Sequence, residues 1–258
     1  MNILLLDIET SPIEAYVWGL WDNNVAINQI KKDWFVLSWA AKWLGKPKIY
    51  QMDQRKEKDV SKDRFIMSQM WQLLDQADVV VTQNGKKFDI PKLNARFVLN
   101  GMKPPSSYQQ IDTRKLAKKY FGFTSNSLEY MAEALNLKHK KLKHKKFPGQ
   151  ELWTECLKGN KEAWKEMAVY NKHDVLTLED LYKKLIPWDN TINFNVYYGN
   201  KDATCTCGSK DFVNNGFSYT KTGKYQRYEC KECGSELRAR QNLVTKDLLK
   251  TLKVGTNR

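Results

Sequence analysis

The sequence predicts an α/β fold, a mixed sheet flanked by helices, followed by a small β-rich domain. Two short, wholly apolar runs, Ile3–Leu6 and Val79–Val81, have the composition of strands that are buried on both faces of a sheet. The segment 60–76 between them repeats its apolar residues at helical spacing. Because a strand, a helix and a second strand in this order form a crossover, we expect the two apolar strands to pair in parallel.

Three segments after the first strand, residues 14–20, 35–44 and 48–52, are rich in aromatic and β-branched residues. Few helical residues separate them, so we expect an antiparallel meander beside the first strand. The helix at 60–76 should bury one face, made of Phe65, Ile66, Met70, Leu73 and Leu74. Later patterns predict helices that begin near Pro91 and at residues 111–113, and helices over 127–135 and 161–185, with Pro187 ending the last.

The domain organisation follows from length and composition. At 258 residues and 30.2 kDa, with 41% hydrophobic and 12% aromatic residues, the chain can bury a substantial core and is not disordered. We expect a large domain at 1–188, a linker at 189–201, a small domain at 202–241 and a basic tail at 242–258. No apolar run approaches the roughly 20 residues of a membrane span and no signal peptide precedes Asp7, so we expect a cytoplasmic protein.

A formal net charge of +14 and a pI near 9.4 indicate a polyanionic partner. Lysine and arginine side chains that contact phosphates release condensed counterions, whereas an enzyme of small neutral metabolites needs no such excess. Charge alone does not distinguish DNA, RNA and an anionic membrane surface.

Two carboxylates end the first strand, in the sequence Asp7-Ile8-Glu9. Side chains alternate along a strand, so Asp7 and Glu9 project from one face while Ile8 projects from the other. Two neighbouring carboxylates are costly to desolvate, and a hard divalent cation between them removes that cost. The alternative is that the strand simply ends here with both acids solvated.

Two further acids lie in informative surroundings. Asp89 follows the second apolar strand and stands at a helix start, where it could equally be an N-cap. Asp174 lies inside the long helix, and Tyr170 precedes it by four residues on the same helix face. Taken singly, a mid-helix aspartate is usually solvated and a tyrosine at that spacing usually packs.

The three motifs together, Asp-X-Glu, Asn-Gly-X-X-Phe-Asp and Tyr-X-X-X-Asp, occur in order along residues 1–186. This part of the chain resembles the DEDD superfamily of 3′→5′ exonucleases, in its tyrosine-bearing branch, which has an RNase H-like fold and includes proofreading domains of DNA polymerases. The resemblance implies that Asp7, Glu9, Asp89 and Asp174 hold two Mg²⁺ or Mn²⁺ ions. It also implies that Tyr170 orients the attacking water or helps to activate it.

Other residues near these motifs have weaker signals. The resemblance implies that Thr10 and Phe88 contact the 3′-terminal nucleotide, although a strand-end hydroxyl and a core aromatic are the plain alternatives. The histidine branch of the superfamily places its base five residues before the last aspartate, and that position is Val169 here. We therefore expect His173 to pack at the periphery, and we expect Asp112 to cap a helix.

A basic run at 138–146 holds six lysines and two histidines in nine residues. Blocks of like charge are normally solvated, and such a loop near the site can follow a phosphate backbone. We expect it to contact nucleic acid through Lys138, Lys140, Lys141, Lys143, Lys145 and Lys146. The neighbouring Phe147 and Trp153 are expected to pack rather than to stack on bases.

Four cysteines gather in the last fifth of the chain, as Cys205-Thr206-Cys207 and Cys230-Lys231-Glu232-Cys233. In a reducing compartment such a cluster favours metal binding, and four thiolates suit one tetrahedral Zn²⁺. The segment resembles zinc ribbons, although ribbons usually have two residues between paired cysteines and the first pair here has one. Its basic residues favour nucleic-acid binding, with protein docking as the alternative.

These observations predict a metal-dependent 3′→5′ exonuclease, with single-stranded or 3′-ended DNA as the favoured substrate and RNA as the alternative. An RNase H-like endonuclease or ribonuclease would use the same acids. A catalytically silent nucleic-acid-binding protein is the third possibility, but four acids weaken the docking of phosphates and argue against it.

Overall fold

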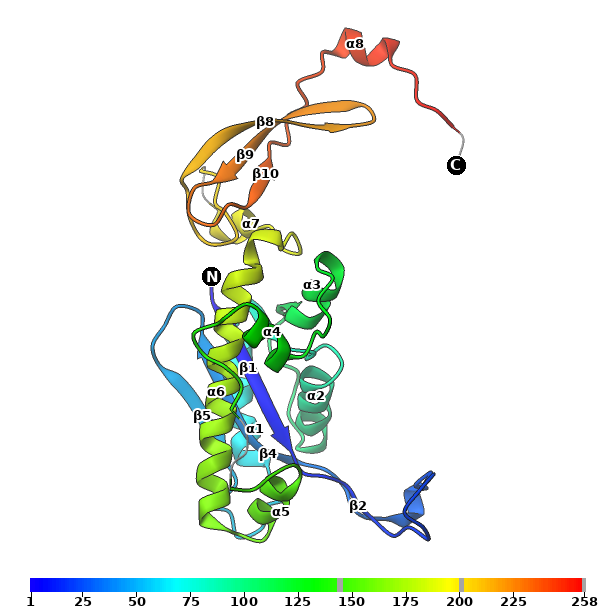
Figure 1. Cartoon of the computed structure of the whole chain (residues 1–258), viewed down its shortest axis with the longest axis vertical. Coiled ribbons are helices and arrows are strands. Elements are labelled where there is room, and N and C mark those ends of the chain that lie inside the picture. Colours follow the sequence, from blue (N-terminus) through cyan, green and yellow to red (C-terminus); the bar gives the residue numbers. More distant parts are fainter. Residues whose placement is uncertain (143–145, 200–201, 257–258) are drawn as a thin grey trace. The chain divides into compact units, whose positions relative to one another are not determined.

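The computed structural model describes residues 1–142, 146–199 and 202–256, and Figure 1 shows the whole chain. The chain divides into two compact units, unit 1 at Met1–Tyr182 and unit 2 at Lys183–Arg258. None of the described helices is long and apolar enough to cross a membrane.

Unit 1 is built on a five-stranded mixed sheet with the strand order β5-β4-β1-β6-β7. The central strand β1 (Ile3–Thr10) pairs antiparallel with β4 (Val36–Trp43), which pairs antiparallel with β5 (Ile49–Asp53). On its other side β1 pairs in parallel with β6 (Val79–Thr82), and β6 pairs in parallel with β7 (Gln109–Asp112). The predicted fold class, a mixed sheet flanked by helices, is therefore confirmed, although β7 was not foreseen.

One face of the sheet packs against α1 (Arg64–Asp75) and α2 (Asp89–Leu99). Their buried side chains form one core with Leu4, Leu6 and Ile8 of β1. Phe65 was expected in this core but is 55% exposed. The apolar stripe of α1 passes through Ile66, Met67, Met70, Leu73 and Leu74, and Phe65 lies outside it.

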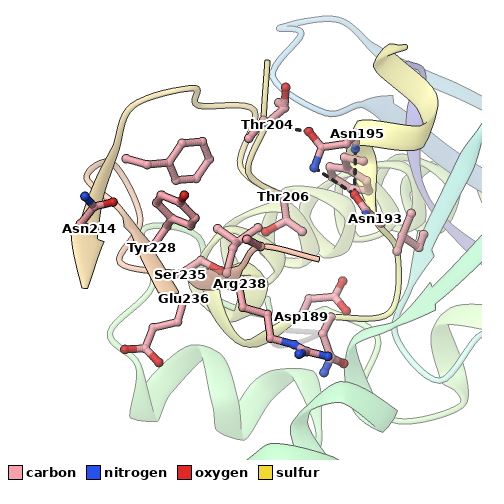
Figure 2. Close-up of a pocket in the computed structure, with 17 residues that line it drawn as sticks. Asp189, Asn193, Asn195, Thr204, Thr206, Asn214, Tyr228, Ser235, Glu236 and Arg238 are labelled. Carbon is pink, nitrogen blue, oxygen red and sulfur yellow. Dashed lines mark hydrogen bonds between the residues drawn. The ribbon is translucent and has the colours of Figure 1, made fainter. Parts of the chain in front are cut away.

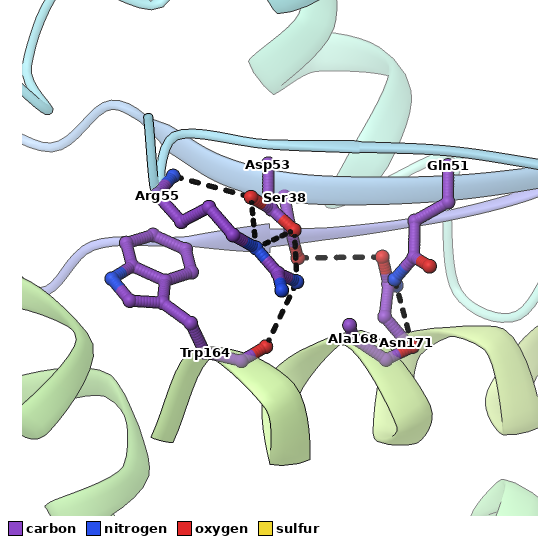
Figure 3. Close-up of polar contacts among 7 residues, drawn as sticks. All are labelled: Ser38, Gln51, Asp53, Arg55, Trp164, Ala168 and Asn171. Carbon is purple, nitrogen blue, oxygen red and sulfur yellow. Dashed lines mark hydrogen bonds and ion pairs between the residues drawn. The ribbon is translucent and has the colours of Figure 1, made fainter. Parts of the chain in front are cut away.

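The long helix α6 (Lys161–Leu185) has the predicted bounds and is joined to β4 and β5 by polar contacts (Figure 3). Gln51 Nε2 donates to the Ala168 carbonyl at 2.7 Å, and Arg55 donates to the Trp164 carbonyl at 3.2 Å. Ser38 Oγ donates to Asn171 Oδ1 at 3.4 Å. Because these contacts involve successive turns of the helix, they fix its rotation and its register along the sheet.

The helix is anchored further along by a buried ion pair between Lys42 of β4 and Glu179, with 2.6 Å between Lys42 Nζ and Glu179 Oε2. Beside the first turns of α6 lies α5 (Glu151–Leu157), which confirms that the stretch around Cys156 is helical. Its buried residues form a second core with Phe35 and Leu37 at the start of β4 and with the first turns of α6. Phe147 belongs to this core, so the expectation that it packs is confirmed.

The shorter helices α3 (Thr113–Tyr120) and α4 (Leu128–Ala134) lie where the sequence predicted them. Asp112 is the N-cap of α3, and its Oδ1 accepts from the backbone N–H groups of Arg114 at 3.0 Å and Lys115 at 3.3 Å. The expectation that Asp112 acts as a helix cap is therefore confirmed.

The segment 14–20 does not join the meander, which corrects the prediction. Only β2 (Glu14–Ala15) is a strand, and it pairs with β3 (Ile30–Lys32) in a separate two-stranded sheet. A short 3₁₀ turn at Ile27–Gln29 precedes β3. The physical reason is that β4 and β6 already occupy both edges of β1, so no backbone partner is left beside it.

Unit 2 contains a three-stranded antiparallel sheet of β8 (Phe212–Thr220), β9 (Gly223–Cys230) and β10 (Glu236–Arg238). A 3₁₀ turn at Ile186–Trp188 follows α6, α7 (Phe194–Tyr198) lies in the expected linker, and α8 (Lys246–Thr251) lies in the expected tail. A cavity of about 640 Å³ lies in this unit, and Figure 2 shows the residues that line it. Its lining comes from the segment before the sheet and from the sheet itself, and includes Asn193, Asn195, Asn214 and Tyr228.

Candidate functional site

Three of the predicted acidic residues converge where β1 ends beside α6. Oxygen atoms of Asp7, Glu9 and Asp174 all lie within 4.8 Å of one another. Asp7 and Glu9 share one face of β1, whereas Ile8 points into the core on the other face. Alternation along the strand and the fixed rotation of α6 thus bring together side chains that are more than 160 residues apart in sequence.

Asp89 lies at the edge of this group. It is the first residue of α2 and is buried, and its Oδ1 accepts from the Ile8 N–H at 3.2 Å. The N-cap position of α2 belongs to Phe88, so Asp89 is not the cap that the sequence left open. Asp89 is close enough for its charge to raise the pKa values of Asp7 and Glu9.

Two side chains that the sequence did not connect with the acids hold these carboxylates. Asn171 is fully buried on α6, and its Nδ2 donates to Asp7 Oδ2 at 2.6 Å and to the Asp7 carbonyl at 3.3 Å. Trp153 of α5 donates from Nε1 to Glu9 Oε2 at 3.0 Å. Trp153 was expected simply to pack; its ring does contact Tyr170 edge-on, but its N–H also orients a candidate ligand.

The electrostatics of the four acids favour proton uptake when no cation is bound. Burial, followed by Glu9, Asp174 and Asp89, raises the pKa of Asp7 well above its usual value. Burial and then Asp174 raise the pKa of Glu9 to about 8, and burial raises the pKa of Asp89 to about 7. Burial also raises the pKa of Asp174, against the opposing charge of Lys141.

A divalent cation fits this arrangement. Asp174 Oδ1 is buried and has no hydrogen-bond partner among the described residues. A buried carboxylate oxygen without a partner is costly, and hard divalent cations take oxygen ligands at 2.0–2.6 Å. The donor set of clustered carboxylates is therefore suited to Mg²⁺ or Mn²⁺.

Tyr170 lies one turn before Asp174 on α6, and its hydroxyl hydrogen-bonds to the Asp174 carboxylate. Burial, then the charges of Asp174, Glu9 and Asp7, raise the pKa of the Tyr170 phenol far above its usual value. The phenol therefore stays protonated at neutral pH and serves as a hydrogen-bond donor at the site.

Among the described lysines of the basic run, Lys141 enters the site. Lys141 Nζ lies 3.4 Å from Asp174 Oδ2 and 5.1 Å from the centroid of the Tyr170 ring. Lys138 and Lys140 are exposed, and Lys146 pairs with Glu162 at 3.8 Å. Lys143 and Lys145 lie outside the described residues. The contacts of these lysines with nucleic acid remain predictions.

A groove begins next to Glu9. A cavity of about 330 Å³ is lined by Glu9, Thr10, Ser11, Pro12, Phe88, Gln150 and Trp153. Both predicted nucleotide contacts, Thr10 and Phe88, thus line one hollow beside the acids. Phe88 is partly exposed rather than a core aromatic. His173, by contrast, packs edge-on against His139, with 5.6 Å between the ring centroids.

The four cysteines of unit 2 form a second candidate metal site, in which all four Sγ atoms lie within 4.8 Å of one another. The sulfur atoms of Cys205 and Cys233 are 3.5 Å apart and those of Cys207 and Cys230 are 3.7 Å apart. These separations exclude disulfides, which need about 2.05 Å. A tetrahedral zinc ion with bonds of about 2.3 Å holds its sulfur ligands about 3.8 Å apart, so the cluster fits Zn²⁺.

Both cysteine pairs form tight turns despite their different spacing. Gly208 N–H donates to the Cys205 carbonyl, and Gly234 N–H donates to the Cys230 carbonyl, each at 2.8 Å. Both glycines have positive φ, +94° and +73°, which glycine adopts without strain. Burial of Cys230 disfavours its thiolate form. Hydrogen bonds from the backbone N–H groups of Cys233 and Glu232 favour the thiolate more strongly and help to lower the pKa of Cys230 to about 7.

Comparisons with known proteins place this fold in a family. The family model described as the RNase H superfamily matches residues 4–186. No match was found among curated proteins. Among solved structures, the chain is similar to the family B DNA polymerase from the hyperthermophilic archaeon Pyrobaculum calidifontis, with a TM-score of 0.48 and 16% sequence identity. That similarity covers 72% of this chain but only 24% of the polymerase chain. Because the family model spans most of the sequence, the chain belongs to the RNase H superfamily.

Proposed function

We propose that the chain is a metal-dependent 3′→5′ exonuclease of the tyrosine-bearing DEDD branch, acting on nucleic acid with single-stranded DNA as the favoured substrate. The observation that carries this proposal is the convergence of Asp7, Glu9 and Asp174 within 4.8 Å, with Tyr170 one helical turn before Asp174. Membership of the RNase H superfamily and the net charge of +14 support a nucleic-acid substrate.

The metal ligands in this proposal are Asp7, Glu9 and Asp174, with Asp89 completing the set. Two Mg²⁺ or Mn²⁺ ions would make bound water acidic and stabilise the charge that develops on the entering and leaving oxygens of an in-line displacement. The acids must be ionised to bind cations, so their raised pKa values predict that binding releases protons.

The other residues of the site hold and orient the reacting groups. Asn171 fixes the Asp7 carboxylate, Trp153 fixes Glu9, and the Ile8 N–H fixes Asp89. Tyr170 stays protonated, so its role is to orient a water molecule or a phosphate oxygen by hydrogen bonding rather than to remove a proton. Lys141 supplies a positive charge beside Asp174, where a phosphate oxygen could be held.

The selectivity for a 3′ end is assigned to the groove beside Glu9. Phe88 offers an apolar surface that suits a base, and the same cavity is lined by Glu9, whose carboxylate would help to bind the scissile phosphate through metal. Thr10 offers a hydroxyl that can hydrogen-bond to the terminal sugar.

Unit 2 is proposed to be a four-cysteine zinc ribbon that binds nucleic acid. A domain of this size has too little core to fold alone, so Zn²⁺ would supply much of its stability. The three-stranded sheet of unit 2 carries cations stacked on aromatic rings. Lys224 Nζ lies 3.9 Å from the Phe217 ring, and the Arg238 guanidinium lies 4.1 Å from the Tyr225 ring. Cations interleaved with aromatics suit a strand with charged phosphates and stacking bases.

The proposal is tested with DNA and RNA strands labelled at the 5′ end or internally, in Mg²⁺, in Mn²⁺ and in chelator. We expect a ladder that shortens from the 3′ end and requires metal. Asp174→Ala should abolish cleavage and retain strand binding, whereas Glu133→Ala, which removes an exposed acid of α4, should cleave normally. Internal cuts would indicate an endonuclease instead, and bound but intact strands would indicate a silent binder.

A further inference from the structure

Residues 12–34 form a protruding segment, here called the arm, which leaves β1 directly after the candidate ligands Asp7 and Glu9. Its base is closed by two hydrogen bonds, from Ser11 N–H to the Phe35 carbonyl at 2.9 Å and from Phe35 N–H to Ser11 Oγ at 3.0 Å. Strands β2 and β3 form its stem. Figure 1 shows this blue segment extending away from the sheet of unit 1.

The tip of the arm exposes a cluster of large apolar side chains. Trp18 is 100% exposed and Trp21 is 86% exposed. The other exposed apolar residues of the arm are Ile13, Tyr16, Val17, Leu20, Val25 and Ile27. Exposed apolar clusters of this kind mark interaction sites, because isolated exposed side chains are ordinary but contiguous ones are not.

The arm is shaped by its own hydrogen bonds. Tyr16 N–H donates to the Gln29 carbonyl at 2.9 Å, and Gln29 Nε2 donates back to the Tyr16 carbonyl at 3.0 Å. Gln29 Oε1 accepts from the Ala26 N–H at 2.8 Å. These bonds hold the backbone on both sides of the tip, so the two tryptophans are presented outward by a formed structure.

A continuous track joins the candidate active site to the arm. The 330 Å³ cavity beside Glu9 and a neighbouring cavity of about 470 Å³ share Ser11 and Pro12 in their linings. The second cavity is also lined by Trp34, at the base of the arm where the chain returns to β4. Lys92 Nζ lies 3.6 Å from the centroid of the Trp34 ring and 5.2 Å from that of the Phe88 ring. One cation therefore contacts a lining ring of each cavity.

The arm is close enough to meet a strand whose 3′ end lies at the acids. Seven residues separate Ser11 from Trp18, which limits the reach to about 23 Å at roughly 3.3 Å per residue. Successive nucleotides of a fully stacked strand are about 3.4 Å apart and those of an extended strand are farther apart, so Trp18 lies within the length of at most about seven nucleotides from the site. A polymeric substrate that leaves the groove along this track passes the arm.

The charge of the arm suits bases rather than phosphates. It carries three acids, Glu14, Asp22 and Asp33, and two lysines, Lys31 and Lys32, which leaves a formal charge of −1 (2 − 3). A surface without an excess of cations gains little binding free energy from contacts with phosphates. Indole rings, by contrast, stack on any base because every base has a π face.

We infer that the arm is a base-stacking element, in which Trp18 and Trp21 hold unpaired bases of the substrate strand upstream of its 3′-terminal nucleotide. This inference rests on the proposed exonuclease function and adds to it a preference for unpaired strands longer than a few nucleotides. Neither tryptophan is part of the catalytic machinery, so removing them leaves the chemical step intact.

The test compares three double variants of the full-length, zinc-loaded protein: Trp18→Ala/Trp21→Ala, Trp18→Leu/Trp21→Leu and Trp18→Phe/Trp21→Phe. Binding of a 5′-fluorescein-labelled 20-nucleotide thymidine strand is measured by anisotropy in Ca²⁺. Hydrolysis of a thymidine dinucleotide is measured in Mg²⁺. Base stacking contributes a factor of about 5 to 150 per ring, so the alanine variant should bind the long strand at least tenfold more weakly.

The leucine variant should lose as much affinity as the alanine variant, because it keeps the apolar surface but lacks a π face. The phenylalanine variant should stay within about threefold of the wild type, and all three should hydrolyse the dinucleotide normally. Unchanged long-strand affinity in the alanine variant would overturn the inference, as would equal affinity of the leucine and phenylalanine variants. A change in the sedimentation coefficient of the alanine variant would instead identify the arm as an interface between copies of the chain.

The inference and the proposed function fail separately in this experiment. If the wild-type protein binds the long strand but hydrolyses neither substrate, the exonuclease proposal is wrong while the affinities still report on stacking. If the wild-type protein hydrolyses both substrates and the alanine variant matches it in binding and rate, only the role of the arm is wrong.

Discussion

Asn171 provides the sharpest test of how the site is held together. It is fully buried, its Nδ2 donates to Asp7 Oδ2 at 2.6 Å, and its Oδ1 accepts from Ser38 at 3.4 Å. Asn171→Ala removes a hydrogen bond to a charged group, which contributes about 1.5–3 kcal/mol, and leaves the Asp7 carboxylate free to turn and to take up a proton. At 1.4 kcal/mol for each factor of ten, this equals a loss of roughly 10- to 150-fold in metal affinity, which overlaps the roughly 10- to 100-fold range of residues that orient metal ligands.

The assay is isothermal titration with Mn²⁺, together with cleavage rates at increasing Mn²⁺ concentration. We expect the dissociation constant to rise about 10- to 100-fold and high Mn²⁺ to restore most of the cleavage rate, because the ligands themselves remain. Thr177→Ala is the matched control, since Thr177 is buried on the same helix but bonds to the His173 carbonyl rather than to an acid. Unchanged Mn²⁺ affinity in a folded Asn171→Ala protein would refute the reasoning, and so would an equal loss in the control.

Three further predictions concern stability and metal content. In magnesium-free, zinc-loaded protein, folding raises the pKa of Glu9 from 4.5 to about 8 and that of Asp89 from 3.8 to about 7, so both acids hold protons that the unfolded chain has released. The free energy of unfolding, measured by urea denaturation, should therefore fall as pH rises from about 4 to 8. A free energy of unfolding that rises over this range would contradict the burial of these acids. We expect elemental analysis to find one zinc per chain in the wild type and none in Cys230→Ser, which should also bind strands more weakly; equal zinc content in the two proteins would rule out the ribbon assignment. Lys42→Met leaves the buried Glu179 carboxylate without its cation and should lower the free energy of unfolding by about 3–5 kcal/mol, whereas a loss below 1 kcal/mol would show that this ion pair does not anchor α6.

The sequence was most informative where a single local rule governs the structure. Alternation along a strand was enough to put Asp7 and Glu9 on one face, and helical periodicity with Pro187 gave the bounds of α6. The role of Asp112 as a cap followed from its position before a helix. Asp89 had two local interpretations; the structure excludes the N-cap, which is Phe88, and the role of Asp89 as a metal ligand stays a prediction. Its hydrogen bond with the Ile8 N–H, 81 residues away in sequence, could not be read from local sequence.

The residues that the sequence could not reveal act through contacts between distant elements. Asn171 and Trp153 carry no motif of their own, and their partners Asp7 and Glu9 are 164 and 144 residues away. Residues 14–20 of the arm were expected to be a strand of the meander because their aromatic and β-branched residues have high strand propensity. Whether such residues join a sheet depends on a free edge, and local sequence does not show that both edges of β1 are occupied.

The central claim is that the acids around Asp7 hold divalent cations. Its most direct test is the number of Mn²⁺ ions bound by zinc-loaded protein, counted by electron paramagnetic resonance in the wild type and in an Asp7→Asn/Asp174→Asn variant that retains its fold. We predict two bound Mn²⁺ ions per chain in the wild type and none at the same free concentration in the variant. Equal Mn²⁺ binding by both proteins would contradict the claim.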